Sequence, residues 1–428
     1  MKTIVSLLLG LLLVATPAWA QASDEDVSAL QQQMQQLTQL VEQLKGTVQA
    51  QQQRIAELER SATSRPTAQS PSFQASASPA RTAALATQAQ GSLSAFNPEI
   101  GMLADVTGQL SENGADAEGN DKLSVREVEL IVGHPIDPYS RLDTTITFSD
   151  FESPTVEEAY ITHWGLSGEL KAKVGRMRPK IGKASAVHRD QLETVDEPLV
   201  VQKYLGAEGL FRTGVELSGF LPTPWTAVTH ELTAGVMEGG IGEGGTLFGS
   251  NRRYPSLYAH LKNFWDVSDT TNIELGTTYL TGSKDADPRF EVNALGLDAT
   301  LVHYVTPTNK LKWQNELYLQ DRDESITQED SVEFADNPWG FYSLADYRLS
   351  PRWGIGGRFD YVELVDVNPL KRDRHSDTAF GGHLTLYQSE FSRWRMQYRH
   401  TEFAQGSNEN AVFLQGTVAI GVHKHQLQ

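Results

Sequence analysis

Residues 169–182 read ELKAKVGRMRPKIG and mark the junction between an expected strand and an expected loop. From Glu169 to Val174 polar and apolar residues alternate, which is the period-two pattern of a β-strand whose two faces meet different environments. Glycine and proline then interrupt the pattern, and an irregular passage continues to Gly206. The stretch therefore predicts a strand that leads directly into a long loop.

The same alternation recurs from residue 98 onward. After the first twenty residues the 428-residue chain contains no apolar run of about eighteen residues, so helices that cross a membrane are not expected. Alternating segments of about ten residues are typical of a closed membrane barrel, which needs an even number of strands. We predict sixteen, at 99–110, 123–133, 141–148, 156–164, 169–177, 214–221, 229–237, 256–265, 272–280, 293–304, 310–322, 339–349, 352–362, 379–388, 393–402 and 411–422.

The connections between these segments alternate in length. Those after the even strands are short, for example 165–168, 306–308, 350–351 and 389–391, whereas most of those after odd strands are long and polar, for example 111–122, 238–254, 323–337 and 363–377. Short periplasmic turns and long outer loops are typical of outer-membrane barrels. A soluble β-sandwich or a solenoid also has many strands, but it is not expected to show this rhythm. The pattern predicts an all-β, antiparallel transmembrane barrel over residues 98–428.

The two faces of each expected strand differ in chemistry. In the segment 393–402, Trp394 and Met396 alternate with Arg393 and Arg395, which predicts apolar residues toward lipid and polar residues toward the lumen. Tryptophans near the same ends of their strands fit an aromatic girdle, and these are Trp164, Trp313, Trp353 and Trp394.

Charged residues are expected to line the lumen and to set which solutes pass. The early strands contribute acids, the later strands contribute bases, and the strand at 169–177 with its loop contributes a basic cluster. The predicted pore-lining residues are Asp105, Glu127, Glu129, Asp143, Lys171, Lys173, Arg176, Arg178, Lys180, Arg358, Arg393, Arg395 and Arg399. The cluster suggests a mild anion preference, offset by acids later in the loop, and the alternative is that all these charges only solvate a wide lumen.

The direction of two of these arginines depends on the backbone. Strict alternation places Arg176 and Arg178 on the lipid side with Val174, unless the chain bends at Gly175 or Pro179. Glycine inside a strand often marks a β-bulge, so we expect a bulge here.

Three segments precede the barrel. Residues 1–20 have a lysine, an apolar run and an Ala-Trp-Ala cleavage site, which predicts a signal peptide. Residues 21–60 carry a heptad repeat and predict a periplasmic coiled-coil stalk. Its a positions are Val27, Met34, Val41, Val48 and Ile55, and its d positions are Leu30, Leu37, Leu44, Gln51 and Leu58. Residues 61–97 are rich in Ser, Ala, Thr, Pro and Gln and predict a disordered linker.

The motif at 174–182, VGRMRPKIG, resembles the strand-to-loop motif of porins of the phosphate-selective porin O/P type. The resemblance implies a sixteen-stranded trimer in which the loop after this strand folds into the pore. A broader similarity, carried by 156–160, His188, 196–199, 205–210 and 413–423, is to a group labelled zinc-regulated outer-membrane receptors. The absence of a plug domain departs from TonB-driven receptors, and Gln428 stands where a terminal phenylalanine is common in such barrels.

These observations favour a passive porin of the Gram-negative outer membrane for small hydrophilic or anionic solutes, narrowed by the loop after the fifth strand. The expected partners are outer-membrane lipid and further copies of the chain, in a dimer or trimer with the trimer favoured through barrel and stalk, with peptidoglycan as a further candidate. A net charge of −18 argues against nucleic-acid binding. The alternatives are a metal- or chelate-uptake receptor and an envelope-tethering barrel.

No catalytic motif stands out, so an enzyme is not expected, and no cofactor is expected either. Zero cysteines exclude thiolate metal sites. Histidines spread through irregular segments are usually solvated, so we predict no metal site. His188, His423 and His425 are the candidate ligands if one exists.

Overall fold

The computed structural model describes residues 98–112, 122–150, 153–223, 227–240, 245–249, 253–284, 290–326, 332–365 and 376–421. The expected signal peptide, stalk and linker lie outside these ranges, as do His423 and His425. Among the described residues no helix is long and apolar enough to cross a membrane.

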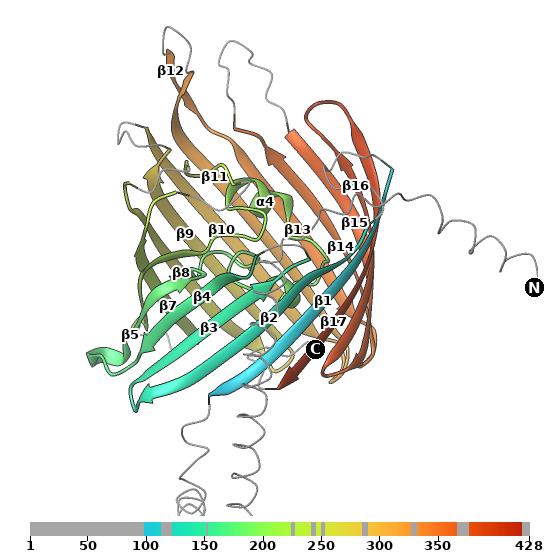
Figure 1. Cartoon of the computed structure of the whole chain (residues 1–428), viewed down its shortest axis with the longest axis horizontal. Coiled ribbons are helices and arrows are strands. Elements are labelled where there is room, and N and C mark those ends of the chain that lie inside the picture. Colours follow the sequence, from blue (N-terminus) through green and yellow to red (C-terminus); the bar gives the residue numbers. More distant parts are fainter. Residues whose placement is uncertain are drawn as a thin grey trace, which may run out of the picture. The chain divides into compact units, whose positions relative to one another are not determined.

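The described chain forms one closed antiparallel barrel (Figure 1). Each strand pairs with its neighbours in sequence, and β1 also pairs with β17, which closes the sheet. The strands are β1 (Glu99–Ser111), β2 (Lys122–Asp137), β3 (Ser140–Phe148), β4 (Thr155–His163), β5 (Lys171–Met177), β6 (Arg212–Phe220), β7 (Val228–Met237), β8 (Ser256–Ser268), β9 (Thr271–Ser283), β10 (Glu291–Tyr304), β11 (Lys310–Ile326), β12 (Val332–Asp336), β13 (Trp339–Arg348), β14 (Trp353–Glu363), β15 (Ser376–Ser389), β16 (Ser392–Glu402) and β17 (Asn408–Gly421).

The elements β12 and β13 together make one strand of the barrel. Both pair with β11 in a single register, and the break between them falls at Asn337 and Pro338, where proline has no N–H to donate. The carbonyl of Pro338 still accepts a hydrogen bond from the amide of Gln320, at 3.0 Å. The barrel therefore has sixteen strands, and the predicted number and positions are confirmed.

The predicted alternation of faces is observed on most strands, and β4 departs from it. On β16, Trp394 and Met396 are exposed on the outside, whereas Arg393 and Arg395 are buried on the inside. The four girdle tryptophans are exposed as well. An outer surface this rich in apolar residues suits lipid rather than water.

The loops also alternate as predicted. Two residues, Pro138 and Tyr139, separate β2 from β3, and two more, Asp269 and Thr270, separate β8 from β9. The loops at the other end of the barrel are mostly longer, and the longest described one follows β5. We call these two ends the short-turn end and the long-loop end.

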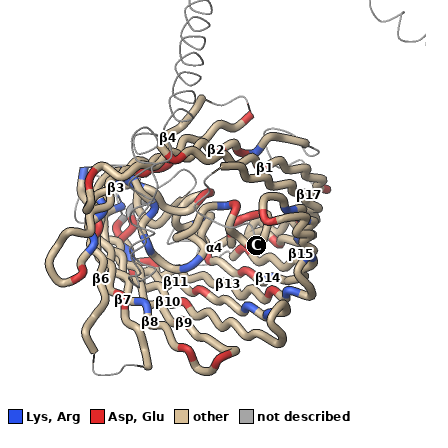
Figure 2. Tube along the Cα trace, turned by 90° about the horizontal axis from the view of Figure 1, so that it is seen from below, with Lys and Arg blue, Asp and Glu red and all other residues tan. Residues whose placement is uncertain are grey.

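Residues 178–211, between β5 and β6, run inside the barrel, and we call this segment the inward loop. In the view along the barrel its helix α4 (Leu199–Tyr204) lies within the ring of strands (Figure 2). The other helical elements are two short turns of 3-10 helix, η2 (Ser167–Glu169) and η3 (Arg189–Gln191). α4 begins after Pro198, whose fixed φ suits a helix start, and ends at Tyr204, two residues before Gly206, which adopts a φ of 129°.

Apolar packing holds the inward loop against one side of the lumen. Leu199, Val200, Val201 and Tyr204 of the loop belong to a buried cluster with apolar residues that point inward from β8 to β15. These partners include Tyr258, Leu280, Val292, Tyr318, Tyr342, Leu344, Val362 and Ala379. Residues 245–249, from the β7–β8 loop, join the cluster, and the amide of Leu247 donates to the carbonyl of Tyr204 at 2.9 Å. This side of the lumen is therefore filled.

Candidate functional site: a charged loop across the lumen

The strand before the inward loop, β5, contains a glycine that no other residue can replace without strain. Gly175 has a φ of 135°, and a Cβ added there would lie 2.3 Å from the carbonyl oxygen of Ala159. The ladders of β5 with β4 and with β6 nevertheless continue through Gly175 without a register shift. The expected bulge is therefore wrong for these ladders, and the guanidinium of Arg176 lies over the ring of Phe211, 5.2 Å from its centre.

Arg178 turns inward after the strand ends. Its side chain is buried, Nη2 donates to Oε1 of Glu157 at 2.6 Å, and its backbone N–H donates to Oε1 of Glu158 at 2.9 Å. Two other bases of the cluster are also paired: Lys173 lies 3.9 Å from Glu216, and Lys180 lies 3.6 Å from Glu231.

The arginines of β14 and β16 bind the inward loop. Arg393 donates to the carbonyl of Asp190 at 2.5 Å, and Arg395 donates to the carbonyl of Thr194 at 2.8 Å. Arg399 donates to Oδ2 of Asp196 at 2.5 Å. These predicted pore-lining residues thus anchor the loop to the wall.

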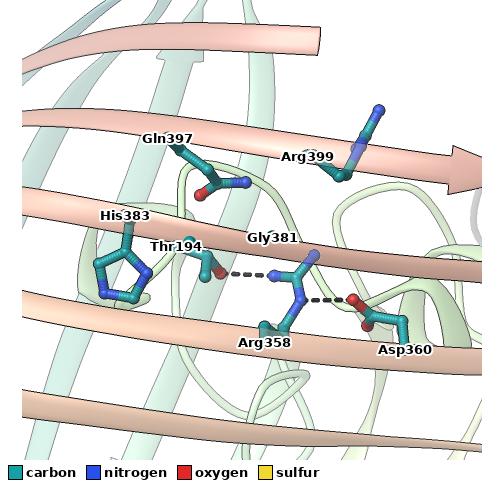
Figure 3. Close-up of a pocket in the computed structure, with 8 residues that line it drawn as sticks. Thr194, Arg358, Asp360, Gly381, His383, Gln397 and Arg399 are labelled. Carbon is teal, nitrogen blue, oxygen red and sulfur yellow. Dashed lines mark hydrogen bonds and ion pairs between the residues drawn. The ribbon is translucent and has the colours of Figure 1, made fainter. Parts of the chain in front are cut away.

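Arg358 lies at the centre of this anchor (Figure 3). Its Nη1 donates to Oγ1 of Thr194 at 2.5 Å, its Nε donates to Oδ2 of Asp360 at 2.7 Å, and its Nη2 lies 3.1 Å from Oδ2 of Asp196. Gln397 donates to the other carboxylate oxygen of Asp196 at 2.6 Å. A cavity of about 10 Å³ remains beside these groups, which is room for about one water.

Burial and charge act in opposite directions on the loop carboxyl groups. Burial alone would raise the pKa of Asp196, but Arg358 and Arg399 lower that pKa below its usual range. Burial likewise opposes ionisation of Glu193, whose pKa is nevertheless lowered by Lys312, 2.6 Å away. Burial raises the pKa of Glu197 to about 7, because the nearby arginines only partly offset it. Asp196 and Glu193 are therefore ionised anchors.

The opposite face of the inward loop is basic and meets an acidic wall. Glu127 and Glu129 of β2, with Glu157 and Glu158 of β4, are buried on the lumen side. Two successive glutamates point inward on β4 because the β3–β4 ladder shifts there: Thr145 pairs with Glu158, but Ile146 pairs with Val156. Arg178, His188 and Arg189 are the loop residues that face these acids.

The remaining predicted acids are paired within their own wall. Asp143 accepts from Arg141 at 2.9 Å, and Asp105 forms an ion pair with Arg126. Lys171 is exposed at the short-turn end of β5.

The inward loop is a layer between two walls of the barrel. Its acidic groups lie toward β14–β16, and its basic groups lie toward β2–β4.

Open space lies beside the acidic wall. A cavity of about 750 Å³ is bounded by β1, β2, the residues just after β3, β17 and the inward loop, and it is lined by Gln109, Ser124, Arg126, Arg189, Glu208 and others. A second cavity, of about 130 Å³, is bounded by β2 to β5 and the loop, and it is lined by Glu129, Tyr160, Lys173, Arg178, Lys180, His188 and others. Both cavities have acidic and basic groups along their walls.

Several residues of the lumen were not predicted from the sequence. Glu157 and Glu158 were not predicted as lumen residues, since alternation puts only one of two neighbours inside. The ion pairs of Lys183 with Glu274 and Asp298 were also missed, because they join the loop to β9 and β10 across about a hundred residues. The sequence did contain a signal for Glu157 and Glu158, because two neighbouring glutamates are unusual on a strand that has one face toward lipid.

No family model matches the chain. An uncharacterized protein of Aquifex aeolicus (strain VF5) is 28% identical over 302 residues, or 65% of this chain, and the chain spans 64% of the length of that relative.

Solved porin structures share the fold. An anion-selective porin from Comamonas acidovorans and OprB of Pseudomonas putida each have a TM-score of 0.51 at 10% identity, covering 76% of this chain and 99% and 94% of theirs. The outer membrane channel DcaP of Acinetobacter baumannii has a TM-score of 0.50 at 11% identity, covering 76% of this chain and 98% of its own. The chain therefore has the barrel fold of outer-membrane porins.

Proposed function

We propose that this protein is a passive porin of the Gram-negative outer membrane, and that small hydrophilic solutes pass between the inward loop and the β1–β5 wall. The observation that supports this most strongly is the pair of polar cavities on that side of a barrel whose other side is filled by apolar packing. A closed barrel with an apolar outer face satisfies its backbone hydrogen bonds in lipid. The inward loop narrows the path, and its anchors keep it there.

The ion preference follows from the charges along this path. Arg358, Arg393 and Arg395 form hydrogen bonds with the inward loop, so their charges have little effect on a mobile ion in the pore. The two cavities are lined by similar numbers of acids and bases. We therefore expect a permeability ratio near one, with the slight anion preference that Lys180 would add, because about half of its side chain stays exposed beside Glu231.

A swelling assay with liposomes tests this function. Vesicles that contain the purified protein should swell in small sugars and amino acids, at rates that fall with solute size. Vesicles that contain heat-denatured protein provide the control. Equal swelling with and without folded protein would contradict a porin.

The chain is proposed to act as a homo-oligomer, with a trimer favoured, in contact with outer-membrane lipid. Residues 21–60 would add a periplasmic coiled coil, and a stalk of this kind could also meet peptidoglycan. Chemical crosslinking of the full chain and of a variant lacking 21–60 separates barrel contacts from stalk contacts. A monomer in both would count against oligomeric assembly.

A further inference from the structure

His188 of the inward loop points one ring nitrogen at two carboxylates from different strands. Its Nδ1 lies 3.7 Å from Oε1 of Glu129 on β2 and 3.5 Å from Oε1 of Glu157 on β4. These three ligand atoms all lie within 4.8 Å of one another, and all three residues are buried. Two ligand atoms of a tetrahedral zinc are about 3.4 Å apart, given bonds of about 2.1 Å. The separations from the imidazole are already close to that value.

The other ring nitrogen is held by a third carboxylate. Nε2 of His188 lies 3.0 Å from Oε2 of Glu158. When Nε2 carries the proton and donates it to Glu158, the lone pair of Nδ1 faces Glu129 and Glu157. A carboxylate behind a ligating histidine is the usual arrangement at metal sites, where it fixes the tautomer and the ring orientation.

The cluster also has more buried acidic groups than basic ones. Glu127, Glu129, Glu157 and Glu158 are four carboxyl groups, and the nearby cations are Arg178, which donates to Glu157, and Arg189, which also pairs with Glu208. Oε1 of Glu129 is fully buried and accepts no hydrogen bond from any residue that the structure describes. Glu129 also shares a side-chain hydrogen bond with Glu127, which requires a proton between these two carboxyl groups, and a bound cation would take the place of that proton.

We propose that Glu129, Glu157 and His188 bind a divalent transition-metal cation such as Zn²⁺, with Glu158 as the positioning residue. One imidazole with carboxylates suits Zn²⁺ better than Ca²⁺ or Mg²⁺, which take oxygen ligands. The cavity of about 130 Å³, lined by Glu129, Glu158 and His188, provides access from the lumen. Arg178 competes for Glu157, so we expect a micromolar rather than a nanomolar Kd.

The consequence is a cross-link between the inward loop and two strands of the acidic wall. Bound metal would hold His188 against β2 and β4 on the side where solutes are proposed to pass. The metal site does not depend on the proposed porin function, because binding is measured without transport.

Isothermal titration calorimetry of the folded, EDTA-treated oligomer with Zn²⁺ tests the site. We expect one equivalent per chain, with no comparable heat from Mg²⁺ or Ca²⁺. H188Q and E129Q should each weaken binding at least tenfold, and E158Q, which removes only the positioning group, by about 10- to 100-fold. H303Q is the matched control, because His303 lies on β10 outside the cluster.

A double variant, H423Q/H425Q, separates this site from the C-terminal histidines and should bind as the wild type does. Should H188Q and E129Q fail to fold, Co²⁺ added to the wild-type protein gives the test, with visible absorption bands of a tetrahedral site that Zn²⁺ displaces. Absence of both heat and bands would overturn the proposal. So would Zn²⁺ binding that H423Q/H425Q abolishes or that folded H188Q and E129Q retain in full.

Discussion

The replacement Asp196→Ala should loosen the inward loop while the barrel stays folded. Asp196 is the carboxylate between Arg358 and Arg399, and it also accepts from Gln397. Removing one partner of a buried ion pair costs about 3–5 kcal/mol, because the other charge stays buried. The apolar cluster around α4 is unchanged in this variant. The lost free energy therefore destabilises the docked position of the loop and not the barrel. A displaced loop should then become more populated by two to three orders of magnitude or more.

Single-channel recording measures this change. We expect the wild type to give quiet open levels and Asp196→Ala to flicker between those levels and a larger conductance. Thermal unfolding of the barrel should change little. Asp196→Asn, which keeps the shape and loses the charge, should give a smaller effect. Asp269→Asn, in the exposed β8–β9 turn, is the matched control. Wild-type conductance and noise in Asp196→Ala would refute the anchoring role.

Three further predictions concern the loop, the strand before it and the lipid face. Because burial raises the pKa of Glu197 from 4.5 to about 7, docking of the loop should weaken as pH rises from 4.5 to 7 and then level off, a change of roughly 3 kcal/mol. Channel noise should rise over that window in the wild type but not in Glu197→Gln, and a flat wild-type profile would contradict it. Gly175→Ala should impair folding in a heat-modifiability gel, since its Cβ would clash with Ala159, whereas Gly168→Ala, which has open space around it, should cost only about 1 kcal/mol. Leu217→Arg, on the outer face of β6, should destabilise the protein in bilayers by up to about 2–4 kcal/mol and much less in urea titrations of the detergent-solubilised form; equal effects would argue against a lipid-facing position.

The barrel could be predicted from sequence because its rules are local. Alternation fixes which residues of a strand face out, and the lengths of the connections fix the two ends. The sixteen predicted segments match the strands to within a few residues. Two differences appear in the structure: 332–336 forms β12 in a stretch predicted as a loop, and the ladders at Gly175 continue without the expected bulge.

The partners of the charged lumen residues could not be predicted in the same way. Arg358 meets Asp196 across more than 160 residues of sequence, and no periodicity reports that the loop will reach this wall. The direction of Arg178 depends on where β5 ends, and the inward turn of both Glu157 and Glu158 depends on a shift in the β3–β4 ladder. Sequence showed which residues carry charge, whereas the structure shows which charges hold the loop.

Conductance of the purified oligomer in planar bilayers tests the central claim most directly. Folded protein, verified by its heat-modifiable mobility on a gel, should insert with discrete conductance steps. In a salt gradient the reversal potential should be near zero and displaced slightly in the direction that indicates anion selectivity. Folded protein that inserts and yet gives no steps would contradict a path beside the inward loop.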